Sequence, residues 1–227
     1  MKKIRLLDVT FENDIQPWEV AAFRGAIVAT AGKEHILFHN HNKDGFRYAY
    51  PLIQYKRIGK KPHLVCIDEG IDEVHHFFEN KQEGLILGDR PYELVVDQIR
   101  LNKFNLQVWD RSFNYLIQDW FPLNQKNYKI YKEIISEIKQ FDFLEKVLIG
   151  NILSFAKGIE WKIDKEIELK ITEILRTNYI SLKGIKREAF TLNFKCNVFL
   201  PNFISLGKNA SLGFGTIREN RKKENGR

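Results

Sequence analysis

Cysteine is scarce in this chain of 227 residues, which holds only Cys66 and Cys196. Each lies within an apolar run that has the character of a strand, HLVCID and NFKCNVF. A free thiol in such a run behaves as a small hydrophobic side chain. We therefore expect no disulfide bond.

Long apolar runs are missing as well. No segment approaches the ~18 uninterrupted apolar residues of a membrane-spanning helix, and the N-terminal MKKIRLLDVTFEND lacks the apolar core of a signal peptide. These absences predict a cytoplasmic protein. The chain also contains no low-complexity linker, so two domains within it should pack against each other rather than move freely.

Acidic residues are outnumbered, with 29 Asp and Glu against 36 Lys and Arg, which gives a net charge of +7 and a pI near 9.2. This balance favours a polyanionic partner over a small acidic substrate. Nucleic acid is the commonest partner of that kind, and a membrane surface is the alternative.

Apolar side chains are plentiful, at 44% of the chain with 17 Phe, which suffices for one large domain or two small ones. Their periodicity in the first half alternates between that of strands and that of helices. It predicts, in order, a strand at 3–11, a helix at 17–31, strands at 46–57 and 63–67, a helix around 71–78 and a strand within 85–101. Strand, helix, strand, strand, helix, strand is the split βαβ order of ferredoxin-like folds.

The second half repeats the beginning of this pattern. It predicts strand structure in 106–123, helical structure in 131–158, strands at 166–175, 178–183 and 191–198, and a last strand at 213–219, with no clear second long helix. We therefore predict an α+β protein of two tandem ferredoxin-like (RRM-like, split βαβ) domains packed together. The predicted domains are 1–103 and 104–220, followed by a basic tail at 221–227.

His39 and His41 are the first candidates for chemistry. In an extended backbone their spacing places both rings on one side, roughly 7 Å apart at the backbone. Imidazole titrates near neutral pH, so one ring could act as base and the other as acid on a phosphodiester. Two alternatives remain open, which are a solvated loop and a metal site, although no third ligand follows in a recognisable motif. We expect no cofactor and no metal ion in catalysis.

A glycine-rich stretch, SLGKNASLGFGTI at 205–217, is the second candidate. Gly207, Gly213 and Gly215 would let the backbone approach an anion closely, and Lys208 adds a positive charge. This pattern suits a phosphate backbone. The alternative is a tight turn that leads into the last strand.

The same stretch resembles the glycine-rich loop of the RAMP superfamily of CRISPR-associated proteins, in which GΦG, five residues and GΦG follow one another, and Ser205 stands here in place of the first glycine. FRGAI at 23–27 and YPLIQYK at 50–56 resemble the N-terminal half of the CRISPR repeat-processing endoribonuclease, the sixth Cas protein, in its b-type branch. Residues 106–190 carry no motif that aligns.

The resemblance implies a metal-independent enzyme that cuts precursor CRISPR RNA within each repeat and leaves a 2′,3′-cyclic phosphate and a 5′-hydroxyl. It implies that His39 and His41 are catalytic and that Tyr48, seven residues further on, assists them. In this chemistry the ribose 2′-OH attacks the adjacent phosphorus, and Tyr48, Lys33 and Lys56 are the nearest donors for the charge that develops on the phosphate.

The expected partner is CRISPR repeat RNA, with other Cas proteins of an effector complex and a second copy of the chain as further candidates, and with no membrane. Two other readings stay open. The first is a non-catalytic RNA-binding subunit of a CRISPR effector complex. The second is a metal-dependent hydrolase that uses His39 and His41 as ligands.

Overall fold

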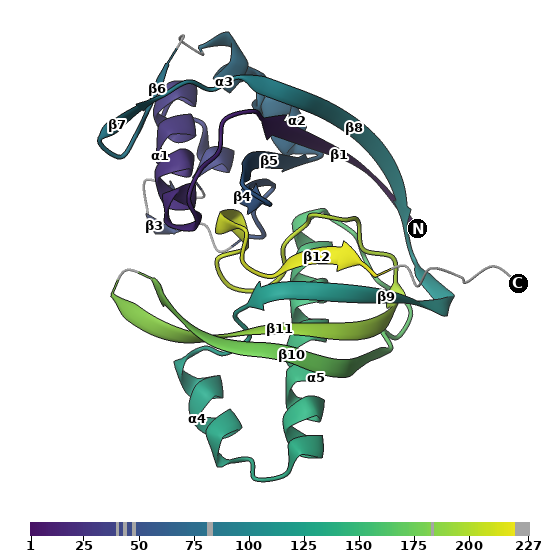
Figure 1. Ribbon diagram of the computed structural model, residues 1–227. Coiled ribbons are helices and arrows are strands. Elements are labelled where there is room, and N and C mark those ends of the chain that lie inside the picture. The colour runs from purple at the N-terminus through teal and green to yellow at the C-terminus, as the bar shows by residue number, and fades with distance from the viewer. Residues whose placement is uncertain (40, 43–44, 47–48, 81–83, 183, 221–227) are drawn as a thin grey trace, which may run out of the picture.

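The computed structural model describes residues 1–39, 41–42, 45–46, 49–80, 84–182 and 184–220, and for residues 41–42 and 45–46 the backbone alone. Its two halves each contain a four-stranded antiparallel sheet. The halves lie one above the other in Figure 1, and the segment before the last strand passes between them. No helix of the described residues is long and apolar enough to cross a membrane.

The N-terminal half has the ferredoxin-like topology that its periodicity predicts, because its sheet has the order β4-β5-β1-β8. Two-residue strands β2 and β3 and the hairpin β6–β7 are added to it. In chain order the elements are β1 (Lys2–Phe11), η1 (Pro17–Glu19), α1 (Val20–Ala31), η2 (Ile36–Phe38), β2 (His41–Asn42), β3 (Gly45–Phe46), β4 (Ile53–Ile58), β5 (Lys61–Ile67), α2 (Glu69–Glu73), α3 (His75–Glu79), β6 (Leu85–Leu87), β7 (Arg90–Tyr92) and β8 (Val96–Leu106).

Strand β1 is buried on both faces, although its alternation predicts a strand buried on one face. Leu7 and Val9 pack in the core beneath α1, as the pattern indicates. The opposite face is covered as well, since Leu6 belongs to the core shared with the C-terminal half and Asp8 is only 4% exposed. The second half therefore covers the polar face of the first sheet.

The C-terminal half repeats the sheet, with the order β10-β11-β9-β12. Its elements are β9 (Val108–Trp120), α4 (Gln125–Glu133), α5 (Glu137–Gly158), β10 (Leu169–Leu182), β11 (Ile185–Val198), η3 (Ala210–Leu212) and β12 (Thr216–Glu219). The two strands predicted at 166–175 and 178–183 are one strand, β10, because its pairing with β11 continues from Leu169 to Leu182 through two register shifts. No helix of four residues or more occurs among the described residues between β11 and β12.

One apolar core joins the halves. Leu52 and Ile67 of the first sheet belong to the same buried cluster as Trp120, Phe155 and Leu206 of the second half. The C-terminal end of α5 reaches the first half, where a Cβ built on Gly158 would lie 2.4 Å from that of Tyr50. These contacts confirm two tandem ferredoxin-like units that are packed together. The predicted division between residues 103 and 104 lies inside β8, which stays paired with β1 as far as Leu106.

Gly215→Ala is expected to destabilise the fold by at least about 2 kcal/mol. The new Cβ would be strained by the left-handed backbone and would also collide with a neighbouring carbonyl oxygen. Gly215 has φ +69°, and a Cβ there would lie 2.0 Å from the carbonyl oxygen of Leu206. Gly59→Ala is the matched control, since Gly59 has φ +64° with open space around it, and it should cost only ~1 kcal/mol. Urea unfolding measures both. Equal losses would show that the contact with Leu206 relaxes.

Candidate functional site

A cleft of about 630 Å³ lies between the two halves. The first half contributes α1, the residue that follows η2 and the residues before β4. The second half contributes the start of α4, one face of α5, β11 and the glycine-rich loop. The lining residues are Arg24, His39, Ala49, Tyr50, Pro51, Phe121, Pro122, Asn124, Asn127, Val147, Asn151, Ser154, Arg187, Gly207, Lys208, Asn209, Ala210, Ser211 and Leu212.

The charge of this cleft is of one sign. Arg24, Arg187 and Lys208 line it together with His39, and no Asp or Glu occurs among the described lining residues. Burial and the nearby Arg187 lower the pKa of Lys208, and burial lowers the pKa of Arg24. Cations that are partly withdrawn from water, with no carboxylate partner among the described residues, favour an anionic ligand, because the ligand would replace the lost hydration.

His39 is held by its neighbours at the wall of the cleft. It follows η2 directly, and its ring Nε2 lies 2.8 Å from the carbonyl oxygen of Lys33. A carbonyl only accepts, so Nε2 donates in this hydrogen bond. The Arg24 guanidinium donates to the carbonyl oxygen of His39. The exposed side chain of Lys33 does not line the cleft, and the contribution of Lys33 to the described site is its backbone carbonyl.

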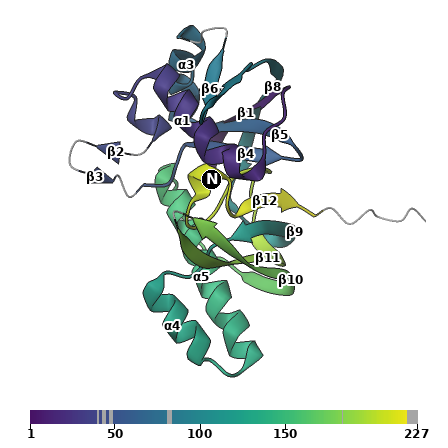
Figure 2. The same cartoon turned by 60° about the vertical axis from the view of Figure 1, so that its left-hand side comes forward.

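The other two predicted catalytic residues lie outside the described part. The backbone of His41 begins β2 and pairs with Phe46 of β3, but its side chain is not among the described ones, and neither is any part of Tyr48. Figure 2 shows β2 and β3 projecting from the first half, beside α1. The catalytic roles of His41 and Tyr48 therefore stay predictions.

The glycine-rich loop divides its glycines between two tasks. Gly207 and Lys208 line the cleft, where they could meet an anion. Gly213 instead packs on β4, since a Cβ there would lie 3.1 Å from the Tyr55 carbonyl oxygen. Gly215 turns the chain into β12, which begins at Thr216 rather than at the predicted residue 213. Neither Gly213 nor Gly215 is among the lining residues.

Lys56 is buried, although the sequence places it among the candidate phosphate donors. It is 1% exposed, and its amine donates to Gln54 Oε1 at 2.8 Å and to the Ser205 hydroxyl. Burial lowers its pKa well below the ordinary value. In this position Lys56 does not reach the cleft and joins β4 to the glycine-rich loop. Ser205, which replaces the first glycine of the RAMP pattern, supplies the hydroxyl that accepts from it.

Lys56→Met is expected to flatten the pH dependence of stability. The pKa of Lys56 is ordinary in the unfolded chain, at 10.5, and well below that value in the folded one. Between the two values the unfolded chain holds one more proton, so the unfolding free energy of the wild type rises with pH. The variant lacks this contribution, and its unfolding free energy at neutral pH should fall by about 1–3 kcal/mol through unpaired polar groups. Urea unfolding from about pH 7 to pH 9 tests this. If the unfolding free energy changed with pH equally in the variant and the wild type, Lys56 would be charged in the folded protein.

Several residues of the cleft have no motif of their own in the sequence. Arg187, Asn124, Asn127, Asn151 and Ser154 come from three separate places along the second half, which are the start of α4, α5 and β11. Arg24 is different, because it lies within the FRGAI motif at 23–27. The sequence could therefore have pointed to it as a cation of the site. Asn151 also accepts a hydrogen bond from the Trp120 indole at 2.9 Å, which fixes its amide.

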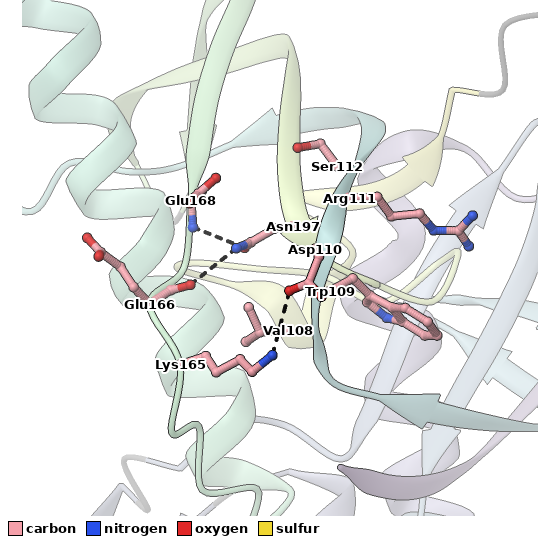
Figure 3. A pocket seen from close by; sticks show the side chains of 9 residues that line it. All are labelled: Val108, Trp109, Asp110, Arg111, Ser112, Lys165, Glu166, Glu168 and Asn197. Atoms are coloured by element: carbon pink, nitrogen blue, oxygen red, sulfur yellow. Dashed lines mark hydrogen bonds and ion pairs between the residues drawn. The ribbon is translucent and has the colours of Figure 1, made fainter.

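A second hollow, of about 380 Å³, lies at the end of the second sheet and differs in charge. Figure 3 shows Lys165 joined to Asp110 and the Asn197 amide joined to the backbone of Glu166 and Glu168. Its lining holds two cations, Arg111 and Lys165, and Lys165 is paired with Asp110 at 3.7 Å. Three carboxylates in its lining would repel a phosphate, so the cleft between the halves is the better site for a polyanion.

Two tandem ferredoxin-like sheets, with a glycine-rich loop that docks between them in place of the last helix, define a protein of the RAMP class. Comparison with family models narrows this class. The Cas6b N-terminal domain matches residues 2–105, and the Cas6b C-terminal domain matches residues 107–220. The chain belongs to the Cas6b family, as the motifs at 23–27, 50–56 and 205–217 indicate.

Solved structures agree with this assignment, and one curated protein is similar to part of the chain. A crystal structure of Cas6b superimposes with a TM-score of 0.85 at 27% identity, over 96% of this chain and all of that one. A CRISPR RNA processing endoribonuclease Cas6b gives a TM-score of 0.74 at 26% identity, with the same coverage. An uncharacterized protein of Methanocaldococcus jannaschii is 35% identical over 101 residues, which are 44% of this chain and 67% of that protein.

Proposed function

We propose that this protein is an endoribonuclease that cleaves precursor CRISPR RNA within its repeats. The RNA 2′-OH attacks the adjacent phosphorus, which gives a 2′,3′-cyclic phosphate and a 5′-hydroxyl without a metal ion in the reaction. The observation that carries the proposal is the cleft between the halves, where His39 stands among cations with no carboxylate in the described lining. The solved Cas6b that is named as a CRISPR RNA processing endoribonuclease supports it.

The lining suits an RNA backbone in two ways. Arg24, Arg187 and Lys208 would neutralise phosphates, and the glycine-rich loop brings the backbone of residues 207–209 to the same surface. The amides of Asn124, Asn127 and Asn151 offer both donors and acceptors, as bases and 2′-hydroxyls require.

The reaction needs two proton transfers and no external nucleophile. One group removes the proton of the 2′-OH, and another protonates the departing 5′-oxygen. Imidazole rings serve both roles near neutral pH, and His39 with His41 are the residues that we assign to them. Arg24 lies against His39 through its carbonyl, so a cation stands next to the position where negative charge would develop on the phosphate.

Incubation of the protein with labelled repeat RNA in EDTA tests this proposal. Cleavage that persists in EDTA and gives cyclic-phosphate ends is the expected result. Tight binding without cleavage would favour the non-catalytic RNA-binding subunit. Cleavage that EDTA abolishes and Mg²⁺ or Mn²⁺ restores would favour the metal-dependent hydrolase.

RNA affinity should fall steeply with salt, and Lys208→Glu should weaken binding to all RNAs alike. Each phosphate contact contributes a slope of about −0.7 in a plot of log affinity against log salt for single strands. Loss of a contact that reads no base affects every sequence equally. Filter binding at several salt concentrations measures both effects.

Lys103→Glu is the matched control, because it makes the same charge change at an exposed residue of β8 outside the lining. It should weaken binding much less than Lys208→Glu. Equal losses in the two variants would show that net charge alone, rather than the cleft, attracts the RNA.

A further inference from the structure

Three side chains with metal-binding groups meet on the N-terminal half, away from the cleft lining. His35 stands just before η2, Glu73 ends α2 and His76 lies in α3. One ligand atom of each lies within 4.8 Å of the other two. All three residues are half-buried, so water does not fully solvate them.

One distance in this cluster matches the spacing of ligand atoms in a zinc site. Zn–N and Zn–O bonds of about 2.0–2.1 Å at a tetrahedral angle separate neighbouring ligand atoms by about 3.3 Å. His35 Nδ1 lies 3.1 Å from Glu73 Oε2. The His35 and His76 rings are stacked with centroids 3.8 Å apart, so the His76 ring has to tilt out of the stack to point one of its nitrogens at the same ion. Two imidazoles and one carboxylate form a donor set that zinc accepts, with a fourth position left for water.

A second group, His75, His76 and Glu79, overlaps the first but fits less well. The side chains of His75 and Glu79 are 52% and 67% exposed, whereas those of His35 and Glu73 are 20% and 34% exposed. The ring Nδ1 of His75 is also engaged with the carbonyl oxygen of Asp72. All members of this second group lie in α3, so an ion bound there would not connect α3 to another element.

We propose that His35, Glu73 and His76 form a binding site for Zn²⁺ or a similar divalent transition-metal ion. Such an ion fastens the segment between α1 and η2 to the α2–α3 helices. Because η2 leads directly into His39, the ion stabilises the support of one wall of the cleft without touching RNA. His35 itself is not a lining residue. The role is structural and separate from the proposed metal-free cleavage.

Calorimetric titration with zinc sulfate tests the site in the full chain, prepared without a polyhistidine tag and freed of metal with EDTA. One equivalent of Zn²⁺ should bind and raise the melting temperature. Co²⁺ in its place should give the visible absorption of tetrahedral coordination. His35→Ala and His76→Ala should each weaken binding by at least ~10-fold, since even an outer partner of a ligand is worth that much.

Two variants serve as controls that keep the fold and remove nearby groups. Glu69→Ala removes an exposed carboxylate of α2, and His75→Ala removes the exposed imidazole next to His76. Both should bind Zn²⁺ as the wild type does. Circular dichroism verifies that every variant is folded, and His35→Asn replaces His35→Ala if the latter is not.

Three results would overturn the proposal. The first is that Zn²⁺ binding does not saturate. The second is that the wild type and His35→Ala bind Zn²⁺ with equal affinity. The third is that His75→Ala loses Zn²⁺ binding while His35→Ala keeps it. The last result would place the ion on α3 alone. The titration contains no RNA, so its outcome is independent of whether the protein cleaves RNA.

Discussion

His39→Ala and His41→Ala are each expected to slow single-turnover cleavage of repeat RNA by roughly 10² or more, with little change in RNA affinity. A general acid or base acts only on the proton in transit, so its loss raises the barrier without removing a binding contact. His39 lines the cleft, with its Nε2 donating to the Lys33 carbonyl oxygen, which orients the ring. The cleavage rate at saturating protein measures the effect.

His75→Ala is the matched control, because the exposed His75 lies outside the cleft lining. Its cleavage rate should equal that of the wild type. The double variant of His39 and His41 should be slower than either single variant, but by less than the product of the two effects, since groups that act as a unit are not additive. The pH–rate profile of the wild type should be bell-shaped, because the proposed reaction needs one group in its basic form and another in its acidic form.

Wild-type cleavage rates in both single variants would show that His39 and His41 are not the catalytic residues. The non-catalytic RNA-binding reading would then be the better one. A loss confined to His39→Ala would keep the cleft as the site but assign the second proton transfer to another group.

A repeat RNA with 2′-deoxyribose at the cleaved nucleotide is expected to bind with near-normal affinity and to remain uncut. The proposed nucleophile is the 2′-oxygen of the RNA, so its removal eliminates the reaction rather than slowing it by a modest factor. The cations of the cleft contact phosphates in this proposal, which explains why binding should survive.

The control substrate carries the deoxyribose one nucleotide further from the scissile phosphate and should be cut at the normal rate. Cleavage of the first substrate would require an activated water molecule as nucleophile. The products would then lack the cyclic phosphate, and the mechanism would have to be assigned anew.

The two halves that form the cleft are joined by polar as well as apolar contacts. The halves share one apolar core, and beside it the buried Gln54, Lys56 and Ser205 form a continuous set of hydrogen bonds. A buried polar set whose members are paired fixes one arrangement of the elements that carry it. These contacts would preorganise the cleft for the RNA that we propose as its ligand.

The fold class follows from the sequence because strand and helix periodicity depend on near neighbours in the chain. The alternation of Leu7, Val9 and Phe11 and the apolar spacing in α1 predict their elements correctly, and the order of the elements selects the ferredoxin-like topology. The strand boundaries around Ile171 and Arg176 were less predictable, since register shifts interrupt the pattern of β10 without ending the strand.

The site was predictable only in part. The glycine-rich stretch at 205–217 and His39 stand out in the sequence, and the structure brings Gly207, Lys208 and His39 to one cleft. The convergence of Arg24 and Arg187 on the same cleft was decided by tertiary structure. Lys56 shows the reason most clearly, because its burial depends on Ser205, which lies 149 residues further along the chain. No local pattern reveals whether a lysine faces solvent or a distant hydroxyl, since the second domain that covers it is positioned only by folding.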